Sequence, residues 1–153
     1  MTTIAYRDGI IAGDSGSENS NVMYRGAIKV VRGQDGSLHG VTGSAPDASV
    51  YIRWVLDGME GDAPRPEATN RQDGLSAFIA IVVPPVGNMI RLWTAYGWED
   101  HHDVPFMAIG AGSEMAIGAM AAGATAEQAV SIVAMHSNFA ALPVRTACRA
   151  LQD

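Results

Sequence analysis

The chain has 153 residues, 48% of them apolar and 17% charged, and its formal net charge is −6. This length suits a single domain that buries about two-thirds of the surface of its unfolded chain, so we expect one domain over residues 1–153. The acidic balance, without any basic cluster, argues against nucleic acid or an anionic membrane as a partner, and no run of about 18 apolar residues is present to span a bilayer.

Two short strands around a tight turn are predicted for the first fourteen residues. Asp8-Gly9 suits the turn because glycine tolerates a positive φ, and the flanking residues are apolar and β-branched. Asp14 then ends the second strand, close to the beginning of the first. Residue 2 is small, so we expect methionine aminopeptidase to remove Met1 and to leave Thr2 with a free amine. A threonine in this position can act as both nucleophile and base.

The remaining chain predicts strands, a helix, more strands and then two helices. The ranges that predict strands are 26–32, 38–42, 75–83, 88–95 and 104–109. The predicted helices begin near residues 46, 113 and 125 and end near residues 59, 122 and 136. Loops are expected over residues 15–25 and 60–74, and the tail from Pro143 is ambiguous between strand and helix. This order differs from a doubly wound parallel sheet and fits two antiparallel sheets packed face to face, with helices outside them.

Lys29 is the only lysine of the chain, and it lies among apolar neighbours in a predicted strand. One interpretation is an edge-strand lysine that discourages aggregation. The other is a buried lysine, which needs a partner to keep its proton, and Asp14 is the first acidic candidate. The unperturbed pKa of an N-terminal amine is about 8, and a nearby cation lowers it. Thr2, Asp14 and Lys29 together therefore form a candidate catalytic site.

Several stretches resemble the proteasome β-subunit family, and its simpler bacterial member HslV most of all. They are Thr2-Thr3-Ile4, Ala12-Gly13-Asp14, Val22-Met23, Ile28-Lys29-Val30, residues 40–48 and residues 106–113, with the two helices that follow. The resemblance implies an N-terminal nucleophile (Ntn) hydrolase with an α+β fold, a four-layer αββα sandwich of two antiparallel sheets between helix layers. It also implies that Thr2 is the nucleophile. Asp14 and Lys29 would be its charged supports, and the backbone N–H of Gly43 would be the oxyanion donor.

The chain departs from this family at two places. The family usually has Gly-Ser-Gly at its second strand-to-helix turn, where this chain has Gly110-Ala111-Gly112. The family also has acidic or hydroxyl partners after the last helix, and residues 136–142 of this chain contain no aspartate. The nearest hydroxyls that could replace these groups are Ser113 and Ser137, and Ser113 is the one we assign to the site.

Three other motifs suggest a serine protease, a dinucleotide site and a metal site, but each motif is incomplete. Gly13-Asp14-Ser15-Gly16 is similar to the nucleophile turn of trypsin-like serine proteases, but only twelve residues precede it, too few for the upstream His and Asp. Gly110-Ala111-Gly112 begins like a dinucleotide fingerprint but lacks the third glycine. His101-His102 has no carboxylate or cysteine at metal-ligand spacing on a regular element, so a solvated loop is the preferred interpretation.

The sequence therefore predicts a threonine-type peptidase of the HslV and proteasome kind, which hydrolyses peptide bonds through Thr2 inside a homo-oligomeric ring. Peptides or unfolded proteins are the expected substrates, no cofactor or metal is expected, and a separate unfoldase would use any ATP. Two alternatives stay open: a catalytically silent ring subunit, which Ala111 and the missing aspartate favour, and a small-molecule amidase. The single cysteine, Cys148, and the lack of a secretory signal indicate a cytoplasmic protein.

Overall fold

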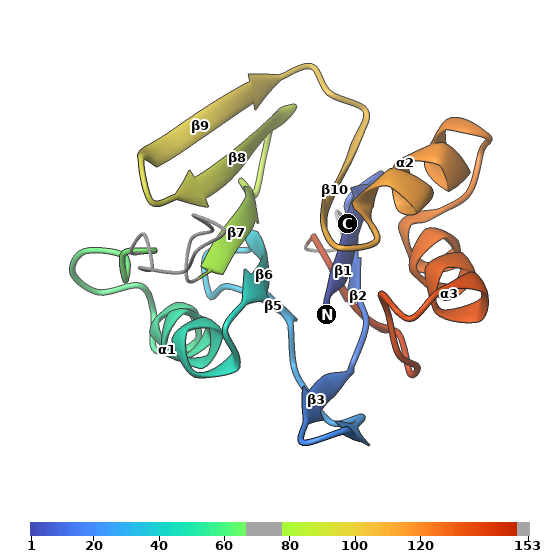
Figure 1. The fold of residues 1–153 in the computed structure, drawn as a ribbon. Coiled ribbons are helices and arrows are strands. Elements are labelled where there is room, and N and C mark those ends of the chain that lie inside the picture. Colours follow the sequence, from blue (N-terminus) through green and yellow to red (C-terminus); the bar gives the residue numbers. More distant parts are fainter. Residues whose placement is uncertain (67–77, 150–153) are drawn as a thin grey trace.

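A computed structural model describes residues 1–66 and 78–149 of the chain (Figure 1). The strands are β1 (Thr3–Arg7), β2 (Ile10–Gly13), β3 (Ser17–Asn19), β4 (Val22–Tyr24), β5 (Val30–Arg32), β6 (Leu38–Gly43), β7 (Phe78–Val83), β8 (Met89–Thr94), β9 (Gly97–His102), β10 (Phe106–Gly110) and β11 (Arg145–Cys148). The helices are α1 (Ala45–Leu56), α2 (Ser113–Ala121) and α3 (Ala126–His136).

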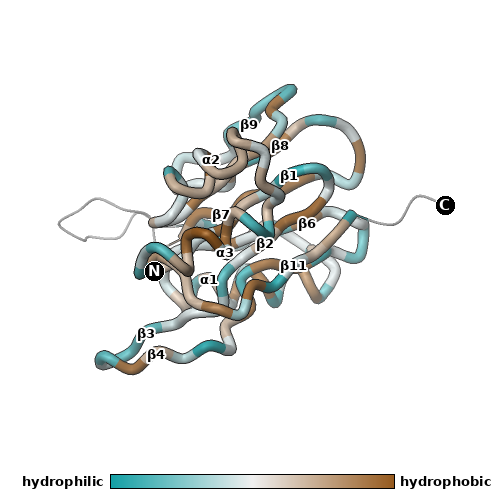
Figure 2. Tube along the Cα trace, turned by 90° about the vertical axis from the view of Figure 1, so that its right-hand side faces the viewer, coloured by the Kyte–Doolittle hydropathy of each residue, from teal (hydrophilic) through white to brown (hydrophobic). Residues whose placement is uncertain are grey.

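Two antiparallel sheets make up the body of the molecule. One has four strands in the order β10-β1-β2-β11, and the other has five in the order β5-β6-β7-β8-β9. The sheets approach closely at Gly40 of β6, because a Cβ atom there would lie 2.7 Å from the side chain of Ile4 in β1. The third sheet is the two-stranded hairpin β3-β4, which projects from the body in Figure 1 and again in the turned view of Figure 2.

Three apolar clusters hold these elements together. Helices α2 and α3 pack on the four-stranded sheet through small aliphatic side chains and Met120. The space between the two sheets is filled by fully buried side chains such as Ile4, Ile11 and Ile81. Helix α1 packs on the five-stranded sheet through Val55 and its neighbours. Because fully burying one such aliphatic side chain contributes about 1.5–3 kcal/mol, these clusters supply the main driving force for folding.

The expected four-layer αββα sandwich is wrong. The described residues form three sheets, of four, two and five strands, and three short helices of 12, 9 and 11 residues. The molecule is therefore mostly sheet, and the helices do not complete two outer layers. The end of α1 has a physical cause. Gly58 adopts a positive φ of 99° just after the helix, and Pro64 and Pro66 follow, so the chain does not continue as a helix there.

Most of the predicted elements are confirmed. The first hairpin turns at Asp8-Gly9, where both residues have a positive φ. The capping box at the start of α3 also forms, because the Thr125 side chain accepts from the backbone of Gln128 and the Gln128 side chain accepts from the backbone of Thr125. The ambiguous tail is resolved as the strand β11. None of the helices in the described parts of the chain is long and apolar enough to cross a membrane.

Two predictions of loops are wrong. Residues 15–25 contain the hairpin β3-β4, and His101-His102 ends the edge strand β9. Strands β3, β4 and β9 are largely exposed on the surface, so they lack the alternation of apolar and polar residues that identifies a half-buried strand. Residues 60–66 of the third predicted loop are irregular, as expected. Residues 67–74 of that loop and residues 75–77 of the following strand lie outside the described residues.

A polar chain, buried at Ser37, His39 and Tyr51, connects the five-stranded sheet to α1. The Ser37 hydroxyl donates to the carboxylate of Asp35, and it lies 2.7 Å from Nε2 of His39, whose Nδ1 lies 2.9 Å from the hydroxyl of Tyr51. This order fits a neutral His39 that donates through Nε2 and accepts from Tyr51. Burial lowers the pKa of His39 to about 4 against the opposing effect of Asp35.

We predict that this histidine makes stability depend on pH. Between pH 6.5 and about 4 the unfolded chain protonates His39 and the folded chain does not, so the free energy of unfolding falls as the pH decreases through this window, by about 3 kcal/mol in total. Urea denaturation across the window measures the loss. His39→Gln should flatten the profile, whereas His102→Gln, on the exposed end of β9, should leave it unchanged. Identical profiles for the wild type and His39→Gln would contradict the assignment.

Candidate active site

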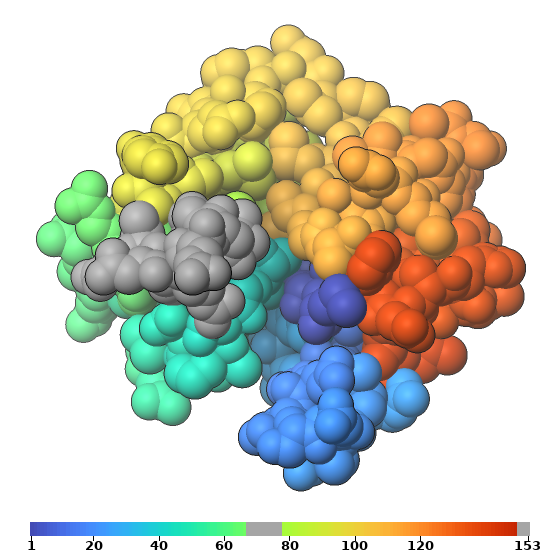
Figure 3. Space-filling view, viewed as in Figure 1, coloured from blue at the N-terminus to red at the C-terminus, as the bar shows by residue number. Residues whose placement is uncertain are grey.

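The candidate site lies where four strands begin or end near one another. β1 begins at Thr3, β2 ends at Gly13, β6 ends at Gly43 and β10 ends at Gly110. Antiparallel pairing places Thr3 opposite Gly110 and Ile4 opposite Gly13. Thr2 and Asp14, just outside these strands, therefore come together, and Asp14 donates its backbone N–H to the Thr3 carbonyl oxygen over 3.2 Å. Figure 3 shows the dark blue N-terminal residues at the centre of one face, between teal, orange and red segments from later in the chain.

The carboxylate of Asp14 is the best-connected polar group of this site, and its side chain is 1% exposed. One oxygen accepts from the backbone N–H of Thr3 over 3.0 Å. The other accepts from the backbone N–H groups of Gly16, over 3.0 Å, and Ala141, over 3.1 Å. Both oxygens also accept from the ammonium of Lys29, over 3.0 and 3.1 Å. This set of donors compensates the cost of burying a carboxylate.

Lys29 lies just before β5, and its side chain is 10% exposed. Its ammonium donates to Asp14 and also to the carbonyl oxygen of Met1, over 3.2 Å. Burial lowers the pKa of Lys29, and the charge of Asp14 and its hydrogen bond oppose this shift. The prediction of a buried lysine paired with Asp14 is confirmed. Because the Met1 carbonyl belongs to the peptide bond with Thr2, the ammonium lies beside the bond whose cleavage would free the Thr2 amine.

Thr2 is held from the other side by the strand-to-helix turn after β10. Its carbonyl oxygen accepts from the backbone N–H of Ala111 over 2.8 Å. Gly110 permits this contact because it adopts a positive φ of 97°, and because a Cβ atom there would lie 2.1 Å from the Thr2 carbonyl oxygen. Any larger residue at position 110 would therefore displace Thr2. The Gly-Ala-Gly stretch is thus a packing junction that positions Thr2.

A cavity of about 230 Å³ opens beside this group, lined by Thr2, Lys29 and Gly43 among others. Gly43, at the end of β6, has a positive φ of 113°. The opposite wall comes from small residues of the first turns of α1, such as Ala48 and Ser49. Four of the five predicted site residues are therefore gathered in one place: Thr2 and Gly43 at the cavity, and Lys29 joined to Asp14.

The two serines that the sequence offered are placed differently. Ser113 is the first residue of α2 and is not among the residues that line the cavity beside Thr2. Its role in the site stays a prediction. Ser137 follows α3, and its hydroxyl donates to the carbonyl oxygen of Val133 and accepts from the backbone N–H of Phe139. It lines a separate cavity of about 610 Å³, which also contains Met1.

The rival nucleophile Ser15 is fully buried and already bonded. Its hydroxyl donates to the carbonyl oxygen of Pro143 over 2.6 Å and accepts from the side chain of Arg145 over 3.1 Å. It therefore has a structural part in joining β2 to the segment before β11. Cys148 is exposed on β11, and His101 lies 2.8 Å from the carboxylate of Glu99 in the same strand.

Sequence analysis missed the contribution of the segment after α3. The Ala141 N–H reaches Asp14, and the carbonyl oxygen of Phe139 accepts from the hydroxyl of Thr3 over 2.8 Å. These contacts use backbone atoms of residues more than 120 positions away, and a backbone N–H or carbonyl has no signature in the sequence. The side chains of this segment, which has no aspartate in residues 136–142, gave no indication of these backbone contacts.

We predict that the charge of Asp14 is essential for stability. Asp14→Asn leaves the Lys29 ammonium buried without a counter-ion, so the free energy of unfolding should fall by about 3–5 kcal/mol. Asp100→Asn is the matched control, because Asp100 pairs with Arg91 over 2.7 Å while its side chain is 40% exposed. An exposed pair of this kind contributes about 0–1 kcal/mol. Urea denaturation at neutral pH compares the two variants, and equal losses would contradict the prediction.

The likeness of this chain to known proteins lies in its fold. No protein-family model and no curated protein matches the sequence. Two solved structures of BPH from Thiobacillus denitrificans are similar, one of BPH itself and one of BPH in complex with epoxomicin. Each is 22% identical to this chain, with a TM-score of 0.68, and the match covers 99% of this chain and 99% or 98% of the other. At this identity the likeness shows that the two proteins share a fold.

Proposed function

We propose that the protein is a threonine-type peptidase that acts through Thr2 once the Met1–Thr2 bond is cleaved. The observation that carries the proposal is the buried Asp14–Lys29 pair, whose ammonium lies 3.2 Å from the Met1 carbonyl oxygen. A cation at this position lowers the pKa of a free Thr2 amine. The amine would then be neutral at a pH nearer 7 and able to act as a base.

The proposed mechanism follows from the groups that line the cavity. The Thr2 amine takes the proton of the Thr2 hydroxyl as its oxygen attacks the carbonyl carbon of the substrate. The backbone N–H of Gly43 stabilises the oxyanion that forms. The amine then passes the proton to the leaving nitrogen, and an ester between the substrate acyl group and Thr2 remains. Water, activated by the same amine, hydrolyses this ester and restores the threonine. The role of Lys29 throughout is electrostatic.

The likeness to BPH supports the same chemistry. BPH has been solved in complex with epoxomicin, and it shares its fold with this chain over nearly the whole length of both. Epoxomicin is a peptide epoxyketone, an electrophile class that reacts with an amine and a hydroxyl on one residue. A free N-terminal threonine offers both groups.

We further propose a homo-oligomeric ring, with extended peptides or unfolded chains as substrates and a separate ATP-dependent unfoldase as partner. Helix α2 buries Ala116 and Met120 but exposes Met115 and Ile117, which are 37% and 42% accessible. An outward apolar face on a helix rich in small residues suits contact with a neighbouring copy. A ring closes when one patch meets a different patch on the next copy, and its interior would exclude folded proteins.

The decisive test of the active nucleophile combines intact mass and labelling. We expect the purified protein to lack Met1 and to gain the mass of one epoxomicin molecule, with peptide mapping placing the adduct on Thr2. Thr2→Ala should form no adduct and should lose any peptidase activity by at least about 10³-fold, while its melting temperature stays near that of the wild type. Retention of Met1 without an adduct would instead favour the silent ring subunit.

A second test concerns the ring. Light scattering should give a mass several times 16.1 kDa, and Ile117→Glu should reduce it to that of the monomer together with the activity. Val86→Glu is the control, because Val86 is 73% exposed and belongs to the turn between β7 and β8 and not to α2. A wild-type protein that is monomeric at micromolar concentration would exclude the ring and favour the small-molecule amidase.

A further inference from the structure

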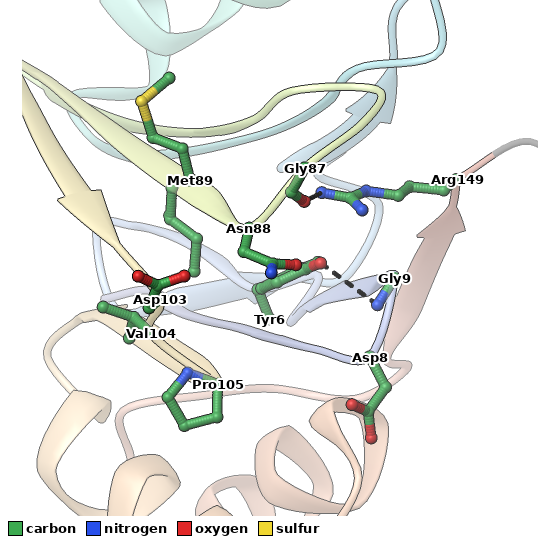
Figure 4. A pocket seen from close by; sticks show the side chains of 11 residues that line it. Tyr6, Asp8, Gly9, Gly87, Asn88, Met89, Asp103, Val104, Pro105 and Arg149 are labelled. Atoms are coloured by element: carbon green, nitrogen blue, oxygen red, sulfur yellow. Dashed lines mark hydrogen bonds between the residues drawn. The ribbon is translucent and has the colours of Figure 1, made fainter.

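Another cavity, of about 470 Å³, lies at the opposite end of β1 from Thr2. Its walls come from the β1–β2 turn, the β7–β8 turn, the connection before β10 and the residue that follows β11 (Figure 4). The cavity therefore opens between the ends of the two sheets. It shares no residue with the cavity beside Thr2, and its volume falls within the range of about 300–1,000 Å³ typical of small-molecule sites.

Arg149 is the cationic group of this cavity, and its guanidinium is incompletely used. Its backbone N–H donates to the carbonyl oxygen of Gly9 over 2.9 Å, which fixes the start of the side chain. One terminal nitrogen donates to the carbonyl oxygen of Gly87 over 3.0 Å. The Nε atom is buried and has no hydrogen-bond partner among the described residues. A buried donor without an acceptor is unusual in folded proteins, and an anionic ligand bound to the guanidinium would offset its electrostatic cost.

An acidic group faces the cavity from the other side. Figure 4 shows Asp103 and Arg149 on opposite sides of Tyr6 and Asn88. Asp103 adopts a positive φ of 58°, and its backbone N–H donates to the carbonyl oxygen of Asn88 over 3.1 Å, so the turn that carries it is tied to the β7–β8 turn. Asp8, the other acidic residue of the wall, instead lies 3.5 Å from Arg7, and its side chain is 86% exposed.

The floor between these two charges is largely apolar. Ile90 is 2% exposed and Tyr6 is 7% exposed, and both belong to the cluster between the sheets, against which Val104 packs. The Tyr6 hydroxyl accepts from the backbone N–H of Gly9 over 3.3 Å, which leaves its own proton available for an acceptor. The Asn88 side chain adds an amide beside it. The cavity thus presents a cation, an anion and an apolar surface in one small space.

We propose that this cavity binds a free apolar α-amino acid. The carboxylate would be held by the guanidinium of Arg149, the ammonium by Asp103 and the Asn88 side-chain oxygen, and the side chain would lie on Tyr6, Ile90 and Val104. A simple anion fits less well because the wall also contains two aspartates. A divalent cation fits less well because Arg149 repels it. The site goes beyond the proposed peptidase activity, and its occupation does not depend on Thr2.

Isothermal titration calorimetry with three probes tests the proposal. L-Leucine has both charges, N-acetyl-L-leucine lacks the ammonium and L-leucinamide lacks the carboxylate. We expect L-leucine to bind and each blocked analogue to bind about tenfold more weakly or worse. No measurable binding of L-leucine at millimolar concentration would overturn the proposal, and so would equal affinities for the three probes.

Two variants assign the charges. Arg149→Met keeps an unbranched side chain, and it should weaken L-leucine binding about tenfold while leaving L-leucinamide binding unchanged. Asp103→Asn keeps a residue that tolerates a positive φ, and it should weaken L-leucine but not N-acetyl-L-leucine. Arg32→Met, on the exposed end of β5, is the control and should bind L-leucine like the wild type. Wild-type affinity for L-leucine in Asp103→Asn would overturn the proposal even if Arg149→Met does not fold.

Discussion

The buried ion pair of Asp14 and Lys29 is the interaction on which the rest of the N-terminal end depends. Two buried charges are costly, and they are tolerated because each is paired and because backbone N–H groups satisfy the carboxylate. The donors come from the start of β1, from the residue before β3, from the residue before β5 and from the segment after α3. The pair therefore joins segments that are far apart in the sequence, and removing either charge leaves the other buried alone.

The same pair gives the site its chemical character. Burial alone favours a neutral lysine, while Asp14 favours the ammonium, and the balance is a lysine whose pKa is lowered but which remains hydrogen-bonded to the carboxylate. An ammonium beside the Met1–Thr2 bond provides positive potential at this position. Backbone geometry at Gly110 and Ala111 then fixes Thr2 from the opposite side. The positive potential thus comes from Lys29, just before β5, and the position of Thr2 comes from the turn after β10.

Strand β1 connects two different environments. At its beginning, Thr2 lies at the cavity with the buried ion pair, and near its end, Tyr6 forms part of the floor of the cavity with Arg149. Both cavities lie where strands of the two sheets end, because the interior between the sheets is filled by side chains such as Ile4 and Ile11. Side chains and backbone groups at strand ends are free to face a ligand, whereas those in the middle of the sheets are committed to packing and pairing.

The sequence by itself determined the hairpins at Asp8-Gly9 and between β7 and β8 and the three helices, and it offered Asp14 as the first candidate partner of the only lysine. These features rest on local turn chemistry, on periodicity, or on the rule that a buried charge needs a partner. Only the tertiary structure decided the incomplete helical layers, the strands β3, β4 and β9, and which of the predicted site residues line the cavity beside Thr2. It also decided the contacts of Ala141 and Phe139 with the site, and the unpaired Nε of Arg149. Exposed strands have no apolar alternation, and contacts through backbone atoms depend on how distant segments pack, which no local pattern of side chains specifies.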